Sequence, residues 1–375
     1  MTRFWVVLGV FLTITFSASA QDEAWPESVA PAYTAYEAAM AERDFAAAYE
    51  AAETAWRAGQ EARIEPARRG RLAENYALLA LAFRQYDTAF EAWHEAAEMS
   101  DRVHAPAPER ARRWYGAALA AFAGNNPVEA QQSAQSASEI EEGANPPLES
   151  RLSGDIHYLL AMTSSELGQM RAVGEHARLA LAGFAASGRA YDQRYASAYY
   201  LSGFDHFLFG DKVESAIAFH FAQHIFGTLD GPDNETATLR SRMWIRMAQG
   251  DLSARELEQV SDRIAASALP EAATYQSTVR TDLPELEAEP INRVPLRYPG
   301  AAQRQGIEGV VLLQYVVNEE GRVEDVQIIA SMPGGVFDAV CIQEVEGWVY
   351  EPLLVDGVPI RRMGETDFIF AFRGG

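Results

Sequence analysis

Residues 309–330 read GVVLLQYVVNEEGRVEDVQIIA, and this stretch decides the fold of the C-terminal part of the chain. Its first run, Gly309–Val317, is rich in β-branched and aromatic residues and alternates only partly between apolar and polar side chains. A second run of strand-forming residues follows over Arg322–Ala330. The intervening Asn318-Glu319-Glu320-Gly321 has the composition of a turn, so the two runs predict a β-hairpin.

Downstream, the pattern predicts in turn a helix, an extended segment, a turn and a last strand, over Gly335–Gly347, Trp348–Pro352, Asp356-Gly357 and Gly364–Arg373. In the last strand the aromatic residues share one face, and the other face holds Asp367, Ile369 and Ala371. These elements predict a small α+β domain in which an antiparallel sheet packs on at least one helix.

The segment from about Val294 to Phe372 resembles the C-terminal domain of TonB, the periplasmic energy transducer of Gram-negative bacteria. The resemblance lies in the order of residues along about the last fifth of the chain, above all Tyr298, Pro299, Gly309, Gly321, Phe337, Trp348, Pro352 and Gly357.

This resemblance implies a way of binding. In TonB, the domain captures a short extended segment of an outer-membrane receptor, the TonB box, which joins an exposed edge of the sheet. Backbone groups then provide most of the contact. The corresponding edge here is the partner-binding candidate and consists of Thr366, Asp367, Phe368, Ile369, Phe370 and Ala371. The alternative is that this strand is paired within its own sheet or covered by a dimer partner.

A different pattern occupies the chain from about Trp25 to Leu269, which is rich in the helix formers Ala, Glu and Arg. Small residues recur at intervals of 41, 41, 43 and 43 residues, at Ala48, Ala89, Ala130, Val173 and Ala216. The recurrence resembles tetratricopeptide repeats, although their period is about 34 residues, and longer helices or longer connections would account for the difference. The predicted fold class is therefore multidomain: an all-α solenoid of tetratricopeptide-like helical hairpins, followed by a small α+β TonB-type domain with an antiparallel sheet.

The first 20 residues have the composition of an export signal. Arg3 supplies a positive charge, Phe4–Phe16 is an apolar run shorter than a membrane-spanning helix requires, and Ala18-Ser19-Ala20 is a small-residue cleavage site. We expect cleavage after Ala20 and a periplasmic location, and an uncleaved anchor in the inner membrane is the alternative. The predicted domains are a signal peptide over 1–20, repeats over 21–270, a linker over 271–292 and the TonB-like domain over 293–375.

The composition of the chain argues against several further classes of function. The 375 residues carry a formal net charge of −22, which argues against nucleic acid as a partner because phosphate binding needs a basic surface. The single cysteine, Cys341, rules out an internal disulfide. His220 and His224 lie four apart without an evident third ligand, and no catalytic motif is present. We therefore expect a non-enzymatic protein without a cofactor or metal.

The sequence departs from TonB outside the C-terminal segment. A typical TonB has an N-terminal membrane helix with a histidine that engages the ExbB–ExbD motor, and then a long proline-rich spacer. Met1–Ala20 contains no histidine, and helical repeats stand where the spacer would be. We expect a periplasmic TonB-like protein that binds outer-membrane receptors, with energy coupling through ExbB–ExbD left open. The alternative is a non-enzymatic helical-repeat scaffold or adaptor in cell-envelope assembly.

The repeats offer weaker candidates for binding. Arg71 and Asn75 lie four residues apart, as in a carboxylate-binding face, but the favoured interpretation is a solvated surface. Similarly, the aromatic stripe through Tyr33, Trp56 and Trp114 is interpreted as core rather than as a ligand site. The ligand of the repeats is not predicted.

Overall fold

The computed structural model describes residues 24–188, 191–250, 252–267, 283–284, 286, 288–293, 296–355 and 357–370. They belong to two compact units, Met1–Ala190 and Tyr191–Gly375, and each unit is described by itself. The predicted signal peptide lies outside the described residues. No helix within the described ranges combines the length and the apolar character needed to cross a bilayer.

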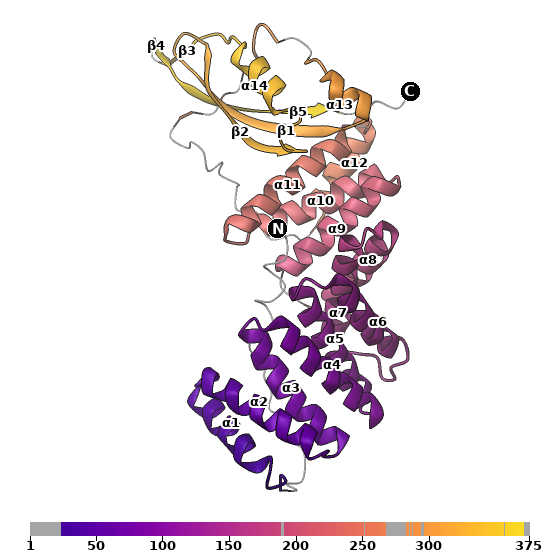
Figure 1. Ribbon diagram of the computed structural model, residues 1–375. Helices are drawn as coiled ribbons and strands as arrows, with labels where there is room; N and C mark the ends of the chain where they lie inside the picture. The colour runs from indigo at the N-terminus through magenta and orange to yellow at the C-terminus, as the bar shows by residue number, and fades with distance from the viewer. Residues whose placement is uncertain are drawn as a thin grey trace. The chain divides into compact units, whose positions relative to one another are not determined.

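The first unit consists of helices in which each one packs against the next along the chain (Figure 1). They are α1 (Ala30–Glu42), α2 (Phe45–Glu61), α3 (Pro66–Ala82), α4 (Tyr86–Arg102), α5 (Ala107–Ala123), α6 (Pro127–Glu142), α7 (Ser150–Glu166) and α8 (Met170–Ala186).

The recurring sequence pattern has a clear structural role. Asp44 caps the N-terminus of α2, where its carboxylate accepts a hydrogen bond from the amide of Ala47 at 3.1 Å. The small residues that mark the period are all buried, at Ala48, Ala89, Ala130, Val173 and Ala216. Because α3 and α4 have 17 residues each, the two helices alone fill about 34 residues, the period of a tetratricopeptide unit. Longer helices, rather than longer connections, therefore account for most of the extended period.

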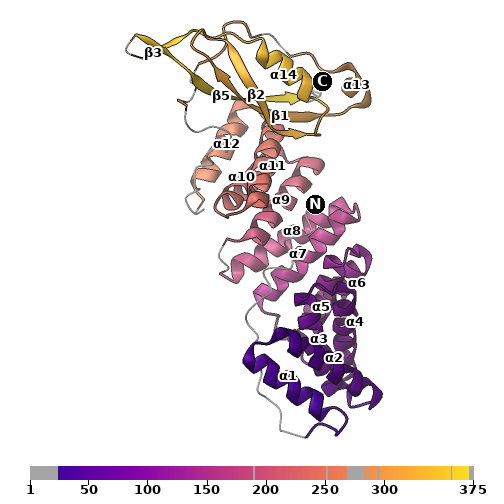
Figure 2. The same cartoon turned by 60° about the vertical axis from the view of Figure 1, so that its left-hand side comes forward.

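The second unit begins with α9 (Gln193–Phe209), α10 (Lys212–Gly227), α11 (Pro232–Gln249) and α12 (Ala254–Ala265). It continues with α13 (Gly300–Gln305), β1 (Gly309–Val317), β2 (Val323–Met332), α14 (Asp338–Glu346), β3 (Leu353–Val355), β4 (Val358–Ile360) and β5 (Arg362–Phe370). The strands β2, β1 and β5 form an antiparallel sheet in that order, and β3 pairs with β4 in a separate hairpin (Figure 2).

The predicted fold class is confirmed: helical hairpins precede a small antiparallel sheet that packs on a helix. The predicted hairpin corresponds to β1 and β2 almost residue for residue. The predicted helix at Gly335 instead begins at Asp338, because Gly335 has a φ of +78°, which a right-handed helix does not contain.

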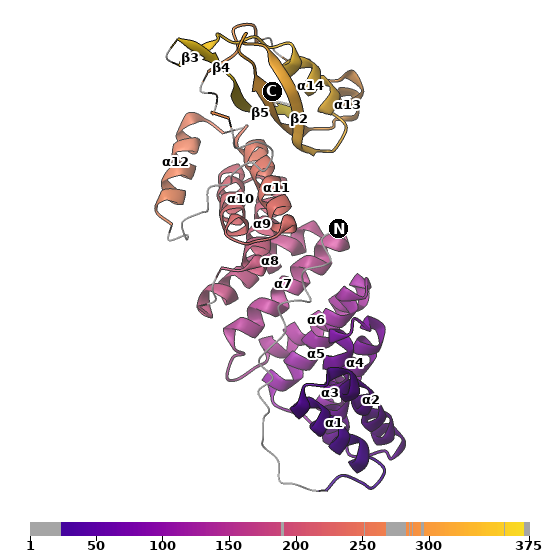
Figure 3. The same ribbon diagram turned by 90° about the vertical axis from the view of Figure 1, so that its left-hand side faces the viewer.

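Both faces of the sheet are covered. On one face, Phe337, Cys341 and Val345 from the α14 region form a buried core with alternate side chains of β1 and β5. On the other face, Val310 of β1 packs against Met243 and Met247 of α11, which lies across the sheet from α14 (Figure 3). Helix α11 and the sheet therefore share a hydrophobic core within the second unit.

A buried ion-pair network ties α3 to α5 in the first unit. The carboxylate of Glu74 accepts hydrogen bonds from Arg112 and from Nε of the buried Arg113, the latter at 3.0 Å. Burial alone would raise the pKa of Glu74, but the two guanidinium groups hold that pKa below its usual value. The ionised carboxylate is therefore part of the folded state at neutral pH.

We expect Glu74→Gln to lower the free energy of unfolding by about 3 kcal/mol at neutral pH, because it leaves the buried Arg113 without the more buried of its two counter-charges. Urea unfolding of the full chain measures this loss. Since the native pKa of Glu74 is lowered, its contribution is present above the unfolded-state pKa and is lost as the pH falls through the native pKa. The difference between wild type and variant should therefore shrink in acid.

The matched control for this variant is Glu109→Gln, since Glu109 also pairs with Arg113 but is much more exposed. That change should cost less than about 1 kcal/mol. Equal losses from the two variants would contradict the role assigned to Glu74.

Candidate functional site

Strand β5 lies at an edge of the sheet. Within the described residues it pairs with β1 on one side only, with a register that runs from Gly309 opposite Phe370 to Val317 opposite Arg362. An edge strand presents a row of backbone N–H and C=O groups that another chain can pair with.

The chain itself occupies the beginning of this edge. The amide of Met363 donates to the carbonyl oxygen of Pro284 at 2.9 Å, and its carbonyl oxygen accepts from the amide of Leu286 at 2.8 Å. Both groups of Met363 therefore point away from β1. Part of the segment predicted as a linker thus adds a short stretch of backbone to the first part of β5.

The direction of the Met363 backbone groups determines which other backbone groups of β5 point away from β1. Backbone groups alternate between the two sides along an antiparallel strand, so those of Glu365, Asp367 and Ile369 also point away from β1. Across the described part of the chain, no other backbone group is hydrogen-bonded to these outward groups. We call the outward backbone groups of Glu365, Asp367 and Ile369 the β5 outer edge.

Because backbone groups alternate in direction along β5, the residues that the sequence assigned to this edge fall into two groups. Thr366, Phe368 and Phe370 direct their backbone groups to β1 and are unable to offer them to a partner. Asp367 and Ile369 belong to the β5 outer edge, and Ala371 lies outside the described residues. Glu365 belongs to the edge but was not among the predicted residues, because the sequence pattern does not reveal which backbone groups are already paired.

Side chains of β5 lie on both faces of the sheet, some in the core and some against α11. Phe368 and Phe370 enter the core, where the Phe370 ring stacks on Phe337 with 4.0 Å between ring centroids. On the opposite face the Asp367 carboxylate pairs with Arg246 of α11 at 3.3 Å, and Glu365 pairs with Arg242 of the same helix. The edge strand is thus held from both faces, and Ile369 is the apolar residue of β5 that stays exposed.

Most residues that carry the family resemblance are structural. The Tyr298 hydroxyl donates to the carbonyl oxygen of Ile307 at 2.6 Å, and its ring meets Phe337 and Phe370 edge to face. Trp348 is buried in the same core, Pro299 precedes α13, and Gly357 lies in the turn between β3 and β4 with a φ of +79°.

Two of these positions admit only glycine. Gly321 has a φ of +80°, and a Cβ there would collide with the carbonyl oxygen of Tyr350. At Gly309 a Cβ would collide with the Phe337 ring. Pro352 lies near Gly321, at the end of the extended segment that follows Trp348. These residues determine how the C-terminal domain folds. The resemblance therefore indicates the fold of this domain more directly than it indicates a surface that contacts a partner.

Two other residues considered in the sequence, Cys341 and His220, have pKa values that are shifted by burial. Cys341 is buried, and burial raises the pKa of its thiol to about 12, so the thiol stays protonated at neutral pH. Burial, with a smaller effect of Arg246, lowers the pKa of His220 to about 4. Among the described residues, no group of three or more potential ligands is arranged to hold a metal ion.

Comparison with known proteins assigns this module to a family. Residues 294–372 match the family model described as Gram-negative bacterial TonB protein C-terminal. Protein TonB of Pseudomonas aeruginosa is 32% identical over 88 residues, which are 24% of this chain and 26% of that protein. The chain therefore spans about a quarter of the length of this TonB relative. The expectation of a TonB-type C-terminal domain is confirmed.

Two solved structures are also similar to parts of this chain. The solution NMR structure of the Pseudomonas aeruginosa TonB C-terminal domain is 28% identical, with a TM-score of 0.23, and covers 25% of this chain and 99% of that chain. A crystal structure of a TPR repeats protein from Bacteroides fragilis is 11% identical, with a TM-score of 0.29, and covers 63% of this chain and 97% of that chain.

The ion pairs between α11 and β5 lead to a test by charge reversal. Arg242→Glu places a carboxylate opposite Glu365 and should lower the free energy of unfolding by about 1 kcal/mol in urea. Adding Glu365→Arg to this variant restores the opposite charges and should recover most of the loss. Arg240→Glu on the exposed side of α11 is the control and should change stability by less than about 0.5 kcal/mol. Failure of the double variant to recover would contradict the pairing.

Proposed function

We propose that this chain is a periplasmic, non-catalytic protein of a Gram-negative bacterium that binds other proteins. In this proposal residues 1–20 direct export, residues 21–270 form a repeat domain, residues 271–292 link it to the rest, and residues 293–375 form the TonB-type domain. The β5 outer edge captures an extended segment of an outer-membrane receptor by strand addition.

The observation that carries this proposal is the set of outward backbone groups of Glu365, Asp367 and Ile369 in a sheet whose faces are both covered. With α14 on one face and α11 on the other, a partner gains most contact by pairing with the edge. An added strand forms backbone hydrogen bonds with little demand on side-chain identity. That property suits a domain that serves several receptors through one short extended segment.

A second candidate function is a scaffold in cell-envelope assembly, in which the β5 outer edge pairs with a second copy of the chain. The observation that favours it is the shared core of α11 and the sheet, because it makes this helix part of the same unit as the sheet. In an extension of the receptor-binding proposal, an ExbB–ExbD motor supplies energy to the bound receptor through this domain.

Binding of TonB-box peptides tests the proposal. Peptides copied from receptor TonB boxes should bind the full chain, and Ile369→Pro should weaken this binding about tenfold, because proline removes an outward N–H of the edge. The N–H lost here does not pair with β1, so the sheet keeps its own ladder. Fluorescence anisotropy of labelled peptides measures the affinities.

The control is Ile369→Val, which keeps both the N–H and a β-branched side chain and should bind like the wild type. Absence of peptide binding in the wild type, or equal binding by the proline variant, would exclude strand addition at this edge. Self-association that Ile369→Pro abolishes would favour the scaffold instead.

A further inference from the structure

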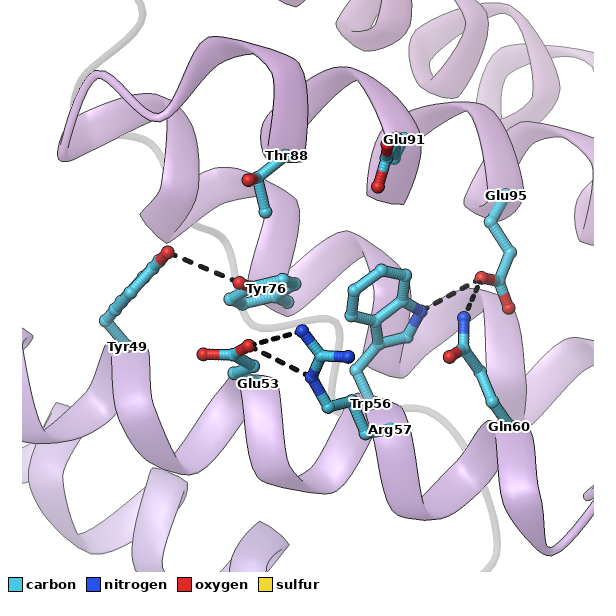
Figure 4. A pocket seen from close by; sticks show the side chains of 9 residues that line it. All are labelled: Tyr49, Glu53, Trp56, Arg57, Gln60, Tyr76, Thr88, Glu91 and Glu95. Carbon is cyan, nitrogen blue, oxygen red and sulfur yellow. Dashed lines mark hydrogen bonds and ion pairs between the residues drawn. The ribbon is translucent and has the colours of Figure 1, made fainter.

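The first unit contains a pocket of about 480 Å³ between α2 and α4, with α3 beneath it (Figure 4). This volume falls in the range of roughly 300–1,000 Å³ that is typical of ligand sites. Its lining combines the aromatic residues Tyr49, Trp56 and Tyr76 with the carboxylates of Glu53, Glu91 and Glu95. The pocket lies far along the chain from β5 and has no part in the function proposed for that strand.

The aromatic side of the pocket is continuous. The ring of Tyr76 lies 5.3 Å from that of Tyr49 and 5.0 Å from that of Trp56, measured between centroids. The hydroxyl groups of Tyr49 and Tyr76 share a hydrogen bond of 3.3 Å, and burial raises the pKa of Tyr76, so its phenol stays neutral. Neutral aromatic faces attract cations, and arginine stacks on them especially well.

Glu95 fixes the shape of this pocket. Its carboxylate accepts hydrogen bonds from Nε1 of Trp56 at 3.1 Å, from Gln60 at 2.5 Å and from Arg69. Because Arg69 neutralises it, Glu95 orients the Trp56 ring and adds little free negative charge. The pocket is therefore largely formed before any ligand arrives.

The other two carboxylates leave negative charge available. Glu53 holds Arg57, but Nε and Nη2 of the guanidinium both donate to the same oxygen, Oε1, at 3.0 and 2.7 Å. Across the pocket on α4, Glu91 is exposed and forms no ion pair with any described residue. Most of the Arg57 side chain is exposed, and its guanidinium extends into the pocket between Glu53 and Trp56 (Figure 4).

The dimensions favour a segment of polypeptide over a small cation. The lining of α2 runs from Tyr49 to Gln60, which corresponds to about 16 Å along a helix. An extended chain of about five residues has this length. The chain as a whole has a net charge of −22, which favours a basic partner over an acidic one.

We propose that the α2–α4 pocket binds an extended segment of a partner protein through one arginine side chain. The guanidinium lies between Glu91 and the second oxygen of Glu53 and packs against the half-buried ring of Tyr49. Arg57 competes with it for Glu53.

Selection from a displayed library of random octapeptides on the purified full chain tests this proposal. Arginine should be enriched at one position, and replacing it in a selected peptide by citrulline, its neutral isostere, should weaken binding at least about tenfold. Absence of arginine enrichment, or equal affinity of the citrulline peptide, would overturn the proposal. Competition by free arginine amide as strong as that of the peptide would overturn the assignment to a polypeptide partner.

Substitutions in the protein test which residues of the α2–α4 pocket contact the arginine of the peptide. Glu91→Gln should weaken the selected peptide about fivefold, whereas Arg57→Gln should strengthen it, because that change removes the competing guanidinium. The matched control is Glu50→Gln, which removes an exposed carboxylate of α2 outside the lining and should leave affinity unchanged. If Glu50→Gln weakens binding as much as Glu91→Gln, the attraction comes from the general charge of the protein and the pocket assignment is wrong.

Discussion

Every residue of β1, from Gly309 to Val317, is buried, so this strand requires an apolar cover on both faces of the sheet. The α14 side supplies one cover, with Phe337, Cys341 and Val345. A small antiparallel sheet usually leaves its other face to water, but here α11 covers it with Met243 and Met247. Helix α11 is therefore part of what stabilises the sheet.

Covering both faces leaves the edges as the places where the sheet can pair with another chain. On β5 the backbone at Pro284 and Leu286 takes the first position, and the outward groups of Glu365, Asp367 and Ile369 follow it. Arg242 and Arg246 hold the carboxylates of this strand against α11. A force applied to a strand bound at this edge would reach α11 through those contacts and through the shared core. This arrangement connects the β5 outer edge to α11 within one unit.

Much of this fold could be predicted from the sequence because its signals are local. The turn at Asn318–Gly321 and the strand-forming runs on either side predicted β1 and β2, and the recurring small residues predicted the helical hairpins. The partial alternation of Gly309–Val317 is also typical of a strand that is buried on both faces. The sequence does not show that α11 covers the second face, because that contact joins residues that are distant in sequence. For the same reason the sequence did not show that Met363 is already paired or that Glu365 lies on the β5 outer edge. Trp56 was predicted as a core residue; it is buried, and it also borders the α2–α4 pocket, whose carboxylates come from two helices.

Binding of a partner strand to the backbone of β5 is measured directly by amide hydrogen exchange. A TonB-box peptide added to the full chain should slow exchange at Glu365, Asp367 and Ile369. The amides of Gly364, Thr366 and Phe368 should change little, because they are already hydrogen-bonded to β1. Slowed exchange in β2 or in the β3–β4 hairpin, with β5 unchanged, would contradict the account.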